Sequence, residues 1–344
     1  MKWQDIVGNE EAKHFLQKLL TAKQRPHAFL LTGVEGIGKR CLAQIFAQTL
    51  FCDNDIEPCG SCSSCIRLRS NNHPDYFFIE PELKKDEQTR KNTIGIEQIR
   101  FLSKEAAYAP KLAKHRIVII DSAHLLTVEA ANSLLKLLEE PPNDWVFVLL
   151  AASIENMLAT ILSRVVVIRM KPLTAAEIMS LLEQKGFTNI EENKLAASLS
   201  EGSLGKAMEY TTGKAIAAKN KALDFLQFCF ANDFLAISSL LEGLEREEAV
   251  LLCEIATTFV RDAWQIKFEQ AESVWYKDVS GQIEKILANF TMKELKLILQ
   301  SVEQTLFALK NSANVRLAME GLFVALSDIQ QGRILGGYSY RHKV

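Results

Sequence analysis

The sequence contains little glycine and proline, 16 and 8 of its 344 residues, and it has no tract built from one or two residue types. This composition argues against a low-complexity or repetitive architecture. Long apolar runs are also missing. VFVLLAA at 146–152 is far too short to span a bilayer, and the first ten residues, MKWQDIVGNE, lack the apolar stretch of a secretory signal. We therefore expect a cytoplasmic protein that has no membrane partner.

An excess of one charge sign is absent as well, because 40 basic and 42 acidic residues give a formal net charge of −2. Such a balance provides no general attraction to nucleic acids or membranes. A DNA contact would have to be a local patch or belong to a partner. Lys111, Lys114 and Arg116 form one short basic stretch that is a candidate patch, and a solvated surface explains this stretch equally well.

The pattern of apolar residues predicts a parallel sheet covered by helices. Between residues 27 and 170, short apolar runs alternate with segments of helical spacing at 97–107 and 128–140. The expected strands are 27–32, 75–80, 116–121, 146–151 and 165–170. Thr174 and Glu177 form a capping box that begins a second, helical unit, and the 3.6-residue rhythm continues beyond residue 212.

The length of the chain indicates two or three domains. We predict an α/β nucleotide-binding-like domain over 1–170 with an insert at 52–65. A small helical domain is expected over 171–211 and an all-α domain over 212–330. The last residues, 331–344, are expected to form a loose tail.

The segment GVEGIGKR at 33–40 resembles a phosphate-binding loop whose last residue is altered. It lies between an apolar run and a helical segment, which is the strand–loop–helix context of the pattern G-x-x-x-x-G-K-S/T. Gly33, Gly36 and Gly38 allow backbone N–H groups to turn toward phosphate oxygens, and Lys39 matches the phosphate-binding lysine. Arg40 stands where a hydroxyl group would bind magnesium, and a guanidinium group repels that cation.

A second change affects the strand at 116–121. That strand is similar to one that usually ends in Asp-Glu, where Asp assists magnesium and Glu polarises the attacking water. Asp121 is present, but Ser122 occupies the position of the glutamate. Metal binding and water activation are both impaired, so we predict that the chain alone does not hydrolyse ATP. Binding of ATP or ADP without turnover remains open.

Four of the seven cysteines lie within fourteen residues, at Cys52, Cys59, Cys62 and Cys65. Six residues separate the first pair, and two residues separate each of the following pairs. This clustering is typical of a tetrahedral zinc site, and an iron–sulfur cluster is the rival interpretation. Disulfides are not expected, because the cytosol keeps thiols reduced. The site contains no histidine and no open position, which indicates a structural metal.

Several segments together resemble the bacterial DNA polymerase III clamp-loader subunits. They are WQDIVGNE, the phosphate loop, the four-cysteine insert, LLKLLEEPP (134–142), ILSRV (161–165) and NVRLAMEGL (314–322). The resemblance covers the whole chain and implies an α/β AAA+ module with a five-stranded parallel sheet, a small helical lid domain and an all-α collar domain. It also implies zinc at the cysteine insert, although the spacing after Cys52 is shorter than usual.

Two kinds of clamp-loader subunit must be distinguished, the ATP-hydrolysing gamma/tau motor and the delta-prime subunit, which is usually inactive. The motor carries Thr or Ser at position 40, Glu at 122, a threonine in the region of 151–153, and an arginine at the position of Gly205. All four positions differ in this chain, which favours the delta-prime type. Such a subunit has no catalysis of its own and is a component of the holoenzyme, a DNA-directed DNA polymerase and nucleotidyltransferase assembly.

The resemblance further implies a role for Arg164 and a set of partners. Ser163 and Arg164 match a Ser-Arg-Cys motif, in which the arginine reaches a neighbouring subunit's nucleotide as an arginine finger; Val165 replaces the cysteine. The partners would be gamma/tau motor subunits and the delta subunit in a hetero-pentameric ring, together with the sliding clamp and primer–template DNA. The alternatives are an active gamma/tau-type ATPase and a zinc-dependent nucleic-acid-binding AAA+ protein.

Overall fold

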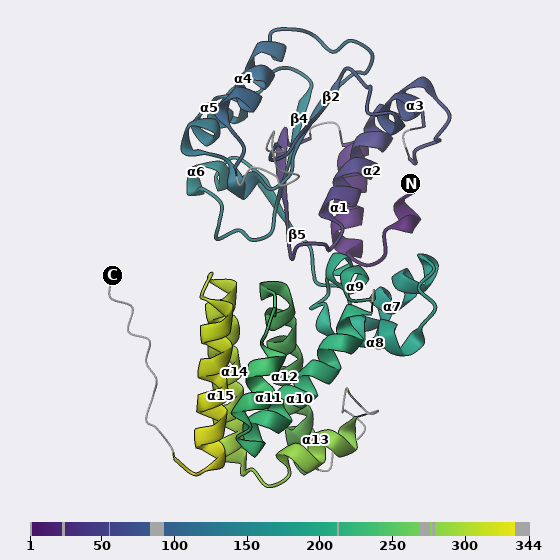
Figure 1. Cartoon of the computed structure of the whole chain (residues 1–344). Helices are drawn as coiled ribbons and strands as arrows, with labels where there is room; N and C mark the ends of the chain where they lie inside the picture. Colours follow the sequence, from purple (N-terminus) through teal and green to yellow (C-terminus); the bar gives the residue numbers. More distant parts are fainter. Residues whose placement is uncertain are drawn as a thin grey trace. The chain divides into compact units, whose positions relative to one another are not determined.

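The computed structural model describes residues 2–22, 25–54, 56–82, 93–211, 213–268, 276 and 279–333. The chain divides into two compact units (Figure 1). The first comprises Met1–Gly186 and Glu201–Lys206, and the second comprises Phe187–Ser200 and Ala207–Val344. Residues of the predicted lid domain, 171–211, fall in both units, and the three-domain division stays a prediction. Most of the predicted tail, from residue 334 onward, lies outside the described residues.

The first unit contains a five-stranded parallel sheet, which confirms the predicted fold class. Its strands are arranged in the order β2-β3-β4-β1-β5. They are β1 (Ala28–Thr32), β2 (Tyr76–Ile79), β3 (Arg116–Ile120), β4 (Trp145–Ala151) and β5 (Val166–Arg169). Every residue of β1, β3 and β4 is buried. Strands that are buried on both faces are apolar along most of their length, which explains why these segments show no alternation in the sequence.

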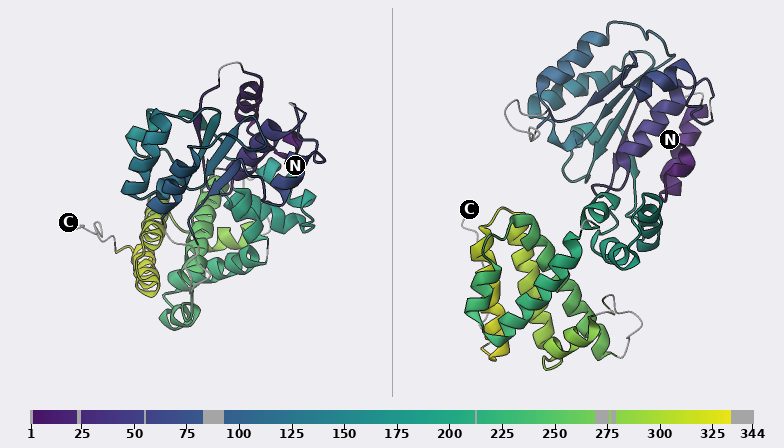
Figure 2. Two further views of the ribbon diagram at one scale, coloured as in Figure 1. Left: turned by 90° about the horizontal axis from the view of Figure 1, so that it is seen from above. Right: turned by 45° about the vertical axis from the view of Figure 1, so that its right-hand side comes forward.

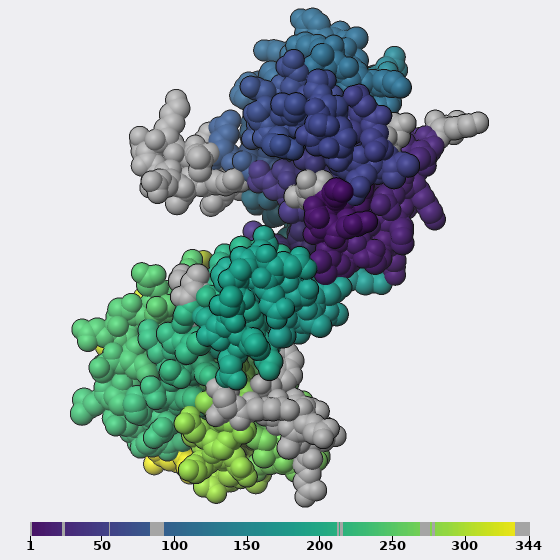
Figure 3. Space-filling view, turned by 90° about the vertical axis from the view of Figure 1, so that its right-hand side faces the viewer, coloured from purple at the N-terminus to yellow at the C-terminus, as the bar shows by residue number. Residues whose placement is uncertain are grey.

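Helices cover both faces of this sheet (Figures 1 and 2). One face carries α1 (Glu10–Thr21) and α2 (Lys39–Phe51), with α3 (Ser63–Arg69) packed on α2. The other face carries α4 (Ile96–Glu105), α5 (Val128–Glu139) and the short α6 (Ala159–Leu162). Figure 3, which is turned toward the side of α1 and α2, shows in purple and blue the surface formed by the chain from its N-terminal segment through α3. Two 3-10 turns, Trp3–Asp5 and Ala123–Leu125, and α7 (Ala175–Gln184) complete the unit.

A buried ion pair lies where β2 and β3 begin. Asp75 and Arg116 are both fully buried, and Arg116 Nε lies 3.3 Å from Asp75 Oδ1. The backbone N–H groups of Lys111, Leu112 and Ala113 donate to the Asp75 carboxylate at 2.7, 2.7 and 3.0 Å. Burial alone raises the pKa of Asp75, but these donors and Arg116 outweigh burial and leave that pKa below its usual value.

The remaining guanidinium donors of Arg116 are also satisfied. They bind the carbonyl oxygens of Glu105 at 2.7 Å and Ala109 at 3.0 Å, and the group lies over the rings of Phe77 and Trp145. Arg116 is therefore an internal anchor of the loop after α4, and its assignment to a basic surface patch is wrong. Burial with complete hydrogen bonding explains how a charge is tolerated there.

We expect Asp75→Asn to lower the free energy of unfolding by about 3 kcal/mol, because the buried Arg116 charge would lose its closest counter-ion and keep only the Glu105 carboxylate at 3.5 Å. Since the folded-state pKa of Asp75 is depressed, its contribution is present above about pH 4 and is lost as the pH falls through the lower folded-state value. Denaturant unfolding at pH 7 and pH 3 tests both statements: the difference between wild type and variant should shrink at pH 3.

The control for this measurement is Glu97→Gln, which breaks the exposed Glu97–Arg100 pair on α4. A surface pair contributes only about 0–1 kcal/mol, so this variant should unfold nearly like the wild type. Equal, small effects of both substitutions would contradict the importance of the buried pair.

The second unit is helical, as predicted. It contains α8 (Ile190–Leu199), α10 (Lys214–Ala231), α11 (Phe234–Leu240), α12 (Arg246–Lys267), α13 (Ser280–Leu287), α14 (Met292–Lys310) and α15 (Val315–Gln330). The helix α9 (Leu204–Tyr210) has residues in both units. Helix α12 packs between α10 and α14 (Figure 2) and buries Ile255, Ala256 and Phe259 in the shared core. Within the described residues, no helix is long and apolar enough to cross a membrane.

Candidate functional site

The phosphate loop follows β1 and leads directly into α2. Gly36 and Gly38 have φ angles of +74° and +101°, a backbone conformation that residues other than glycine rarely adopt. Gly38 is the N-cap residue of α2, and Lys39 is its first residue. Asp121 follows β3, so it lies at the same carboxyl edge of the parallel sheet as the loop. The structure thus brings Gly33, Gly36, Gly38, Lys39, Arg40 and Asp121 to one edge, as a phosphate-binding loop requires.

Lys39 is turned back onto its own loop. Its Nζ donates to the carbonyl oxygens of Gly33 at 2.6 Å and Val34 at 2.8 Å. Burial lowers the pKa of Lys39, while the nearby carboxylates of Glu35 and Asp121 act in the opposite direction. The ammonium group is therefore held by carbonyl oxygens of the loop rather than presented to a phosphate.

Arg40 contacts Asp121, which the sequence analysis identified, together with Glu80 and Phe78, which it missed. Its Nη1 lies 3.1 Å from Glu80 Oε2 and 3.8 Å from Asp121 Oδ2, and the guanidinium lies 4.2 Å from the centre of the Phe78 ring. The positive charge thus lies between two carboxylates, one of which would otherwise assist a magnesium ion. Ser122, at the position of the lost glutamate, adopts a left-handed conformation with φ +57°.

The segment 202–205 packs against the same loop. The Gly205 N–H donates to the Gly36 carbonyl oxygen at 3.2 Å. A Cβ atom added to Gly205 would lie 3.1 Å from Gly36 Cα, which is tighter than nearly all real contacts. The position where motor subunits carry an arginine is therefore occupied by a residue that touches the loop backbone itself. Arg40, held between Glu80 and Asp121, does not fit a magnesium ion at this edge.

Removing Arg40 should make the edge more receptive to a metal–nucleotide complex. We expect Arg40→Thr to raise the affinity for Mg–ADP by roughly tenfold, because repulsion between two like charges near a protein surface is on the order of 1–4 kcal/mol. Fluorescence titration with a labelled ADP, with and without magnesium, measures this change.

Arg100→Thr, which removes an exposed arginine of α4, is the matched control and should leave the affinity unchanged. An equal affinity of wild type and Arg40→Thr would show that Arg40 is not what disfavours the metal.

Arg164 lies at the opposite edge of the sheet. It lies in the short connection between α6 and β5, and β5 runs parallel to β1, so Arg164 lies near the amino ends of the strands. At about 3.3 Å per residue, five residues of β1 place the phosphate loop on the order of 15 Å from this edge. Arg164 therefore cannot serve the loop of its own chain. Its side chain is 34% exposed and forms an ion pair with Glu139 at 2.6 Å.

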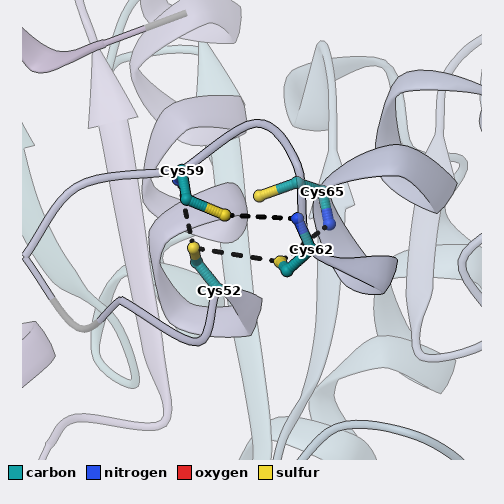
Figure 4. Close-up of side chains that lie close together, drawn as sticks. All are labelled: Cys52, Cys59, Cys62 and Cys65. Atoms are coloured by element: carbon teal, nitrogen blue, oxygen red, sulfur yellow. Dashed lines mark hydrogen bonds between the residues drawn. The ribbon is translucent and has the colours of Figure 1, made fainter.

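The four clustered cysteines come together at the far end of α2 (Figure 4). Cys52 follows the last residue of α2, Cys62 is the N-cap residue of α3, and Cys65 lies in its first turn. The four Sγ atoms all lie within 4.8 Å of one another, and those of Cys52 and Cys62 are 4.0 Å apart. Zinc–sulfur bonds of about 2.3 Å place the sulfurs of a tetrahedral site about 3.8 Å apart, so this set fits zinc.

Backbone N–H groups point at three of these sulfur atoms. Cys59 N–H donates to Cys52 Sγ at 3.2 Å, Cys62 N–H to Cys59 Sγ at 3.3 Å, and Cys65 N–H to Cys62 Sγ at 3.5 Å. Hydrogen bonds from the Ser61 side chain and backbone and from the Cys62 backbone lower the pKa of Cys59 to about 6. Burial raises the pKa of Cys65 to about 12 and also raises that of Cys52. N–H donors that face a sulfur favour the thiolate that a metal requires.

Known proteins with similar sequences are components of bacterial DNA polymerase III. The family model described as "DNA polymerase III, delta subunit" matches residues 8–174. The Pseudomonas aeruginosa delta-prime subunit is 39% identical over 145 residues, 42% of this chain and 42% of that protein. The Escherichia coli delta-prime subunit is 28% identical over 279 residues, 80% of each chain. The Bacillus subtilis tau subunit is 30% identical over 214 residues, 60% of this chain and 36% of that protein.

The chain thus spans less than half the length of the Bacillus and Pseudomonas relatives. Among solved structures, a DNA polymerase III gamma subunit-related protein from Thermotoga maritima matches with a TM-score of 0.50 at 17% identity, covering 93% of this chain and 99% of that one. At this identity the match shows the fold alone, an α/β module with a helical C-terminal part. The matches in sequence support a protein of the DNA polymerase III clamp-loader family, with the family model covering just under half of the chain.

Proposed function

We propose that this chain is a delta-prime type subunit of a bacterial clamp loader, that it does not hydrolyse ATP, and that it completes the ATP site of a neighbouring motor subunit. The observation that carries the proposal is Arg40, whose guanidinium lies between Glu80 and Asp121 at the edge where a motor subunit would bind magnesium. Ser122 lacks the carboxylate that would polarise a water molecule. A chain built in this way can contribute to hydrolysis only by acting on another subunit.

Arg164 is the residue we propose for that action. It lies away from its own phosphate loop, is partly exposed, and has a planar set of donors that matches phosphoryl oxygens. Placed against a neighbour's triphosphate, the guanidinium would stabilise the negative charge that develops on these oxygens during cleavage. The lysine and the metal of that reaction would belong to the neighbour.

The partners follow from the family. We propose gamma/tau motor subunits and a delta subunit in a hetero-pentameric ring that loads the sliding clamp onto primer–template DNA in the cytoplasm. The lid domain over 171–211 and the collar domain over 212–330 remain part of this proposal, with the collar forming the ring contacts. DNA synthesis would belong to other subunits of the holoenzyme.

We also propose that Cys52, Cys59, Cys62 and Cys65 hold one zinc ion. Its chemistry would be structural: when bound, it joins the end of α2 to the start of α3. The four sulfurs leave no ligand position for substrate. We include Cys52 in this set, although fewer residues separate it from Cys59 than is usual in the family. Its Sγ atom lies within 4.8 Å of the other three sulfur atoms.

The test is to compare ATP turnover by the purified chain, by the motor subunits, and by the reconstituted ring. We expect no magnesium-dependent turnover from the chain alone and faster turnover by the motor subunits when the chain is present with clamp and DNA. Robust hydrolysis by the chain alone would instead support an active gamma/tau-type motor, which the similarity to tau subunits favours as the second candidate.

A further inference from the structure

The guanidinium of Arg164 is held on one side by three acceptors. Nη1 donates to the Thr160 carbonyl oxygen at 2.8 Å and to Ser163 Oγ at 3.0 Å, and Nη2 lies 2.6 Å from Glu139 Oε1. Thr160 and Ser163 are within four residues of Arg164, so their contacts are local. Glu139 is the last residue of α5 and is the one acceptor of the three that comes from a different segment.

The donors that remain free define the direction in which Arg164 can bind. An arginine side chain has five N–H donors in one plane. Nη1 donates to Thr160 and Ser163, and Nη2 forms the ion pair with Glu139. Nε has no partner among the residues that the structure describes, and Nε and Nη2 lie along one edge of the guanidinium. This edge has the geometry for bidentate binding of two phosphoryl oxygens.

The position of Glu139 in its helix is otherwise unfavourable. The carboxyl end of a helix carries a partial negative charge, so an acidic residue there is destabilising unless a cation is near. Helix α5 ends with Glu139 and is followed by Glu140 and Pro141. Arg164 supplies the cation for Glu139. An acid at the carboxyl end of a helix goes against the local preference, and the ion pair with Arg164 compensates for it. Departures of this kind are expected at functional sites.

We propose that Glu139 is a positioning residue for Arg164: its carboxylate fixes the guanidinium so that the Nε edge faces outward, toward the neighbour's phosphoryl group. This inference rests on the proposed function of Arg164. Without Glu139, the arginine has more conformations to lose when it binds, and its effect on the neighbour's reaction is smaller. Glu139 does not itself touch the reacting atoms.

The experiment measures kcat and KM for ATP in the reconstituted ring with Glu139→Ala, Glu139→Gln, Arg164→Ala and Glu139→Ala/Arg164→Ala. We expect Glu139→Ala to lower the part of kcat that depends on Arg164 by about threefold, the change that loss of one partly exposed ion pair causes. KM should be unchanged. Glu139→Gln, which retains an acceptor for Nη2, should restore part of the loss, and the double variant should be no slower than Arg164→Ala.

Glu140→Ala is the matched control, since Glu140 is the adjacent exposed acid and makes no ion pair within the described part of the chain. It should behave like the wild type, and all variants should unfold at the same temperature. If Arg164→Ala lowers kcat while Glu139→Ala does not, the positioning role is wrong and the proposed function stands. A further loss in the double variant, or faster turnover with Glu139→Ala, also contradicts positioning. No effect of Arg164→Ala would remove the proposed function itself.

Discussion

Replacing Arg164 by alanine is expected to slow ATP cleavage at the neighbouring site by about a thousandfold or more, the contribution typical of an arginine finger. The physical reason is that the guanidinium meets charge that exists only as the phosphoryl group is transferred, so its removal lowers the rate of the chemical step. Single-turnover hydrolysis in the reconstituted ring isolates this step from ring assembly and product release. Because other motor sites would retain their own arginines, the multiple-turnover rate should fall less.

Two further variants make this result specific. Arg169→Ala removes an exposed arginine at the end of β5, in the same unit and five residues away, and it should leave the rate unchanged. Arg164→Lys retains a positive charge but lacks the planar fork, so it should restore only part of the activity. Equal rates for the wild type and Arg164→Ala, with intact rings, would contradict the trans-acting role.

The strands of the first unit could be predicted because each depends on its own residues. In β3, four consecutive β-branched residues, Ile117 to Ile120, predict a buried strand, and all of them are inaccessible to solvent. The phosphate loop is predictable for the same reason, because its glycines and Lys39 are adjacent in sequence. The change from strands to helices is also visible in the sequence. Short continuous apolar runs give way to apolar residues that recur about every 3.6 positions.

The environments of the arginines could not be predicted in this way. Arg40 and Arg116 each pair with an acid about 40 positions away, Glu80 and Asp75 respectively. Hydrophobic periodicity reports only on local structure, so it cannot distinguish a buried arginine from a solvated one. One signal was present: β2 and β3 are parallel with Tyr76 opposite Ile117, which places Asp75 opposite Arg116. Opposite charges at the starts of two buried strands indicate a pair once the strand order is known.

Glu139 illustrates the same limit in the proposed site. The sequence shows two acids at the end of a helix, and only the fold distinguishes Glu139, which pairs with Arg164, from its exposed neighbour Glu140. The cysteine cluster is the opposite case, because close spacing in the sequence already restricts the distances between its sulfur atoms. The candidate metal site is therefore visible within one short segment, whereas the arginine environments depend on contacts between elements.

Replacing Cys65 by serine should remove the proposed zinc ion entirely and disorder the segment that it joins. Cys65 is buried, and its sulfur lies within 4.8 Å of the other three. Because binding to a structural zinc site of four cysteines contributes on the order of 10 kcal/mol, loss of one ligand should reduce the metal content from one zinc per chain to none. Elemental analysis of the purified protein measures the content, and hydrogen exchange over 52–69 measures the loss of order.

The control for this substitution is Cys41→Ser, since Cys41 is exposed on α2 and lies outside the cluster. It should retain one zinc per chain and exchange like the wild type. A strong chelator should reproduce the Cys65→Ser result in the wild-type protein and leave the sheet intact, because the core cluster that packs α4 and α5 on the sheet contains no residue of 52–69. Iron and sulfide in the purified protein would instead identify an iron–sulfur cluster, and one zinc retained by Cys65→Ser would contradict the four-cysteine site.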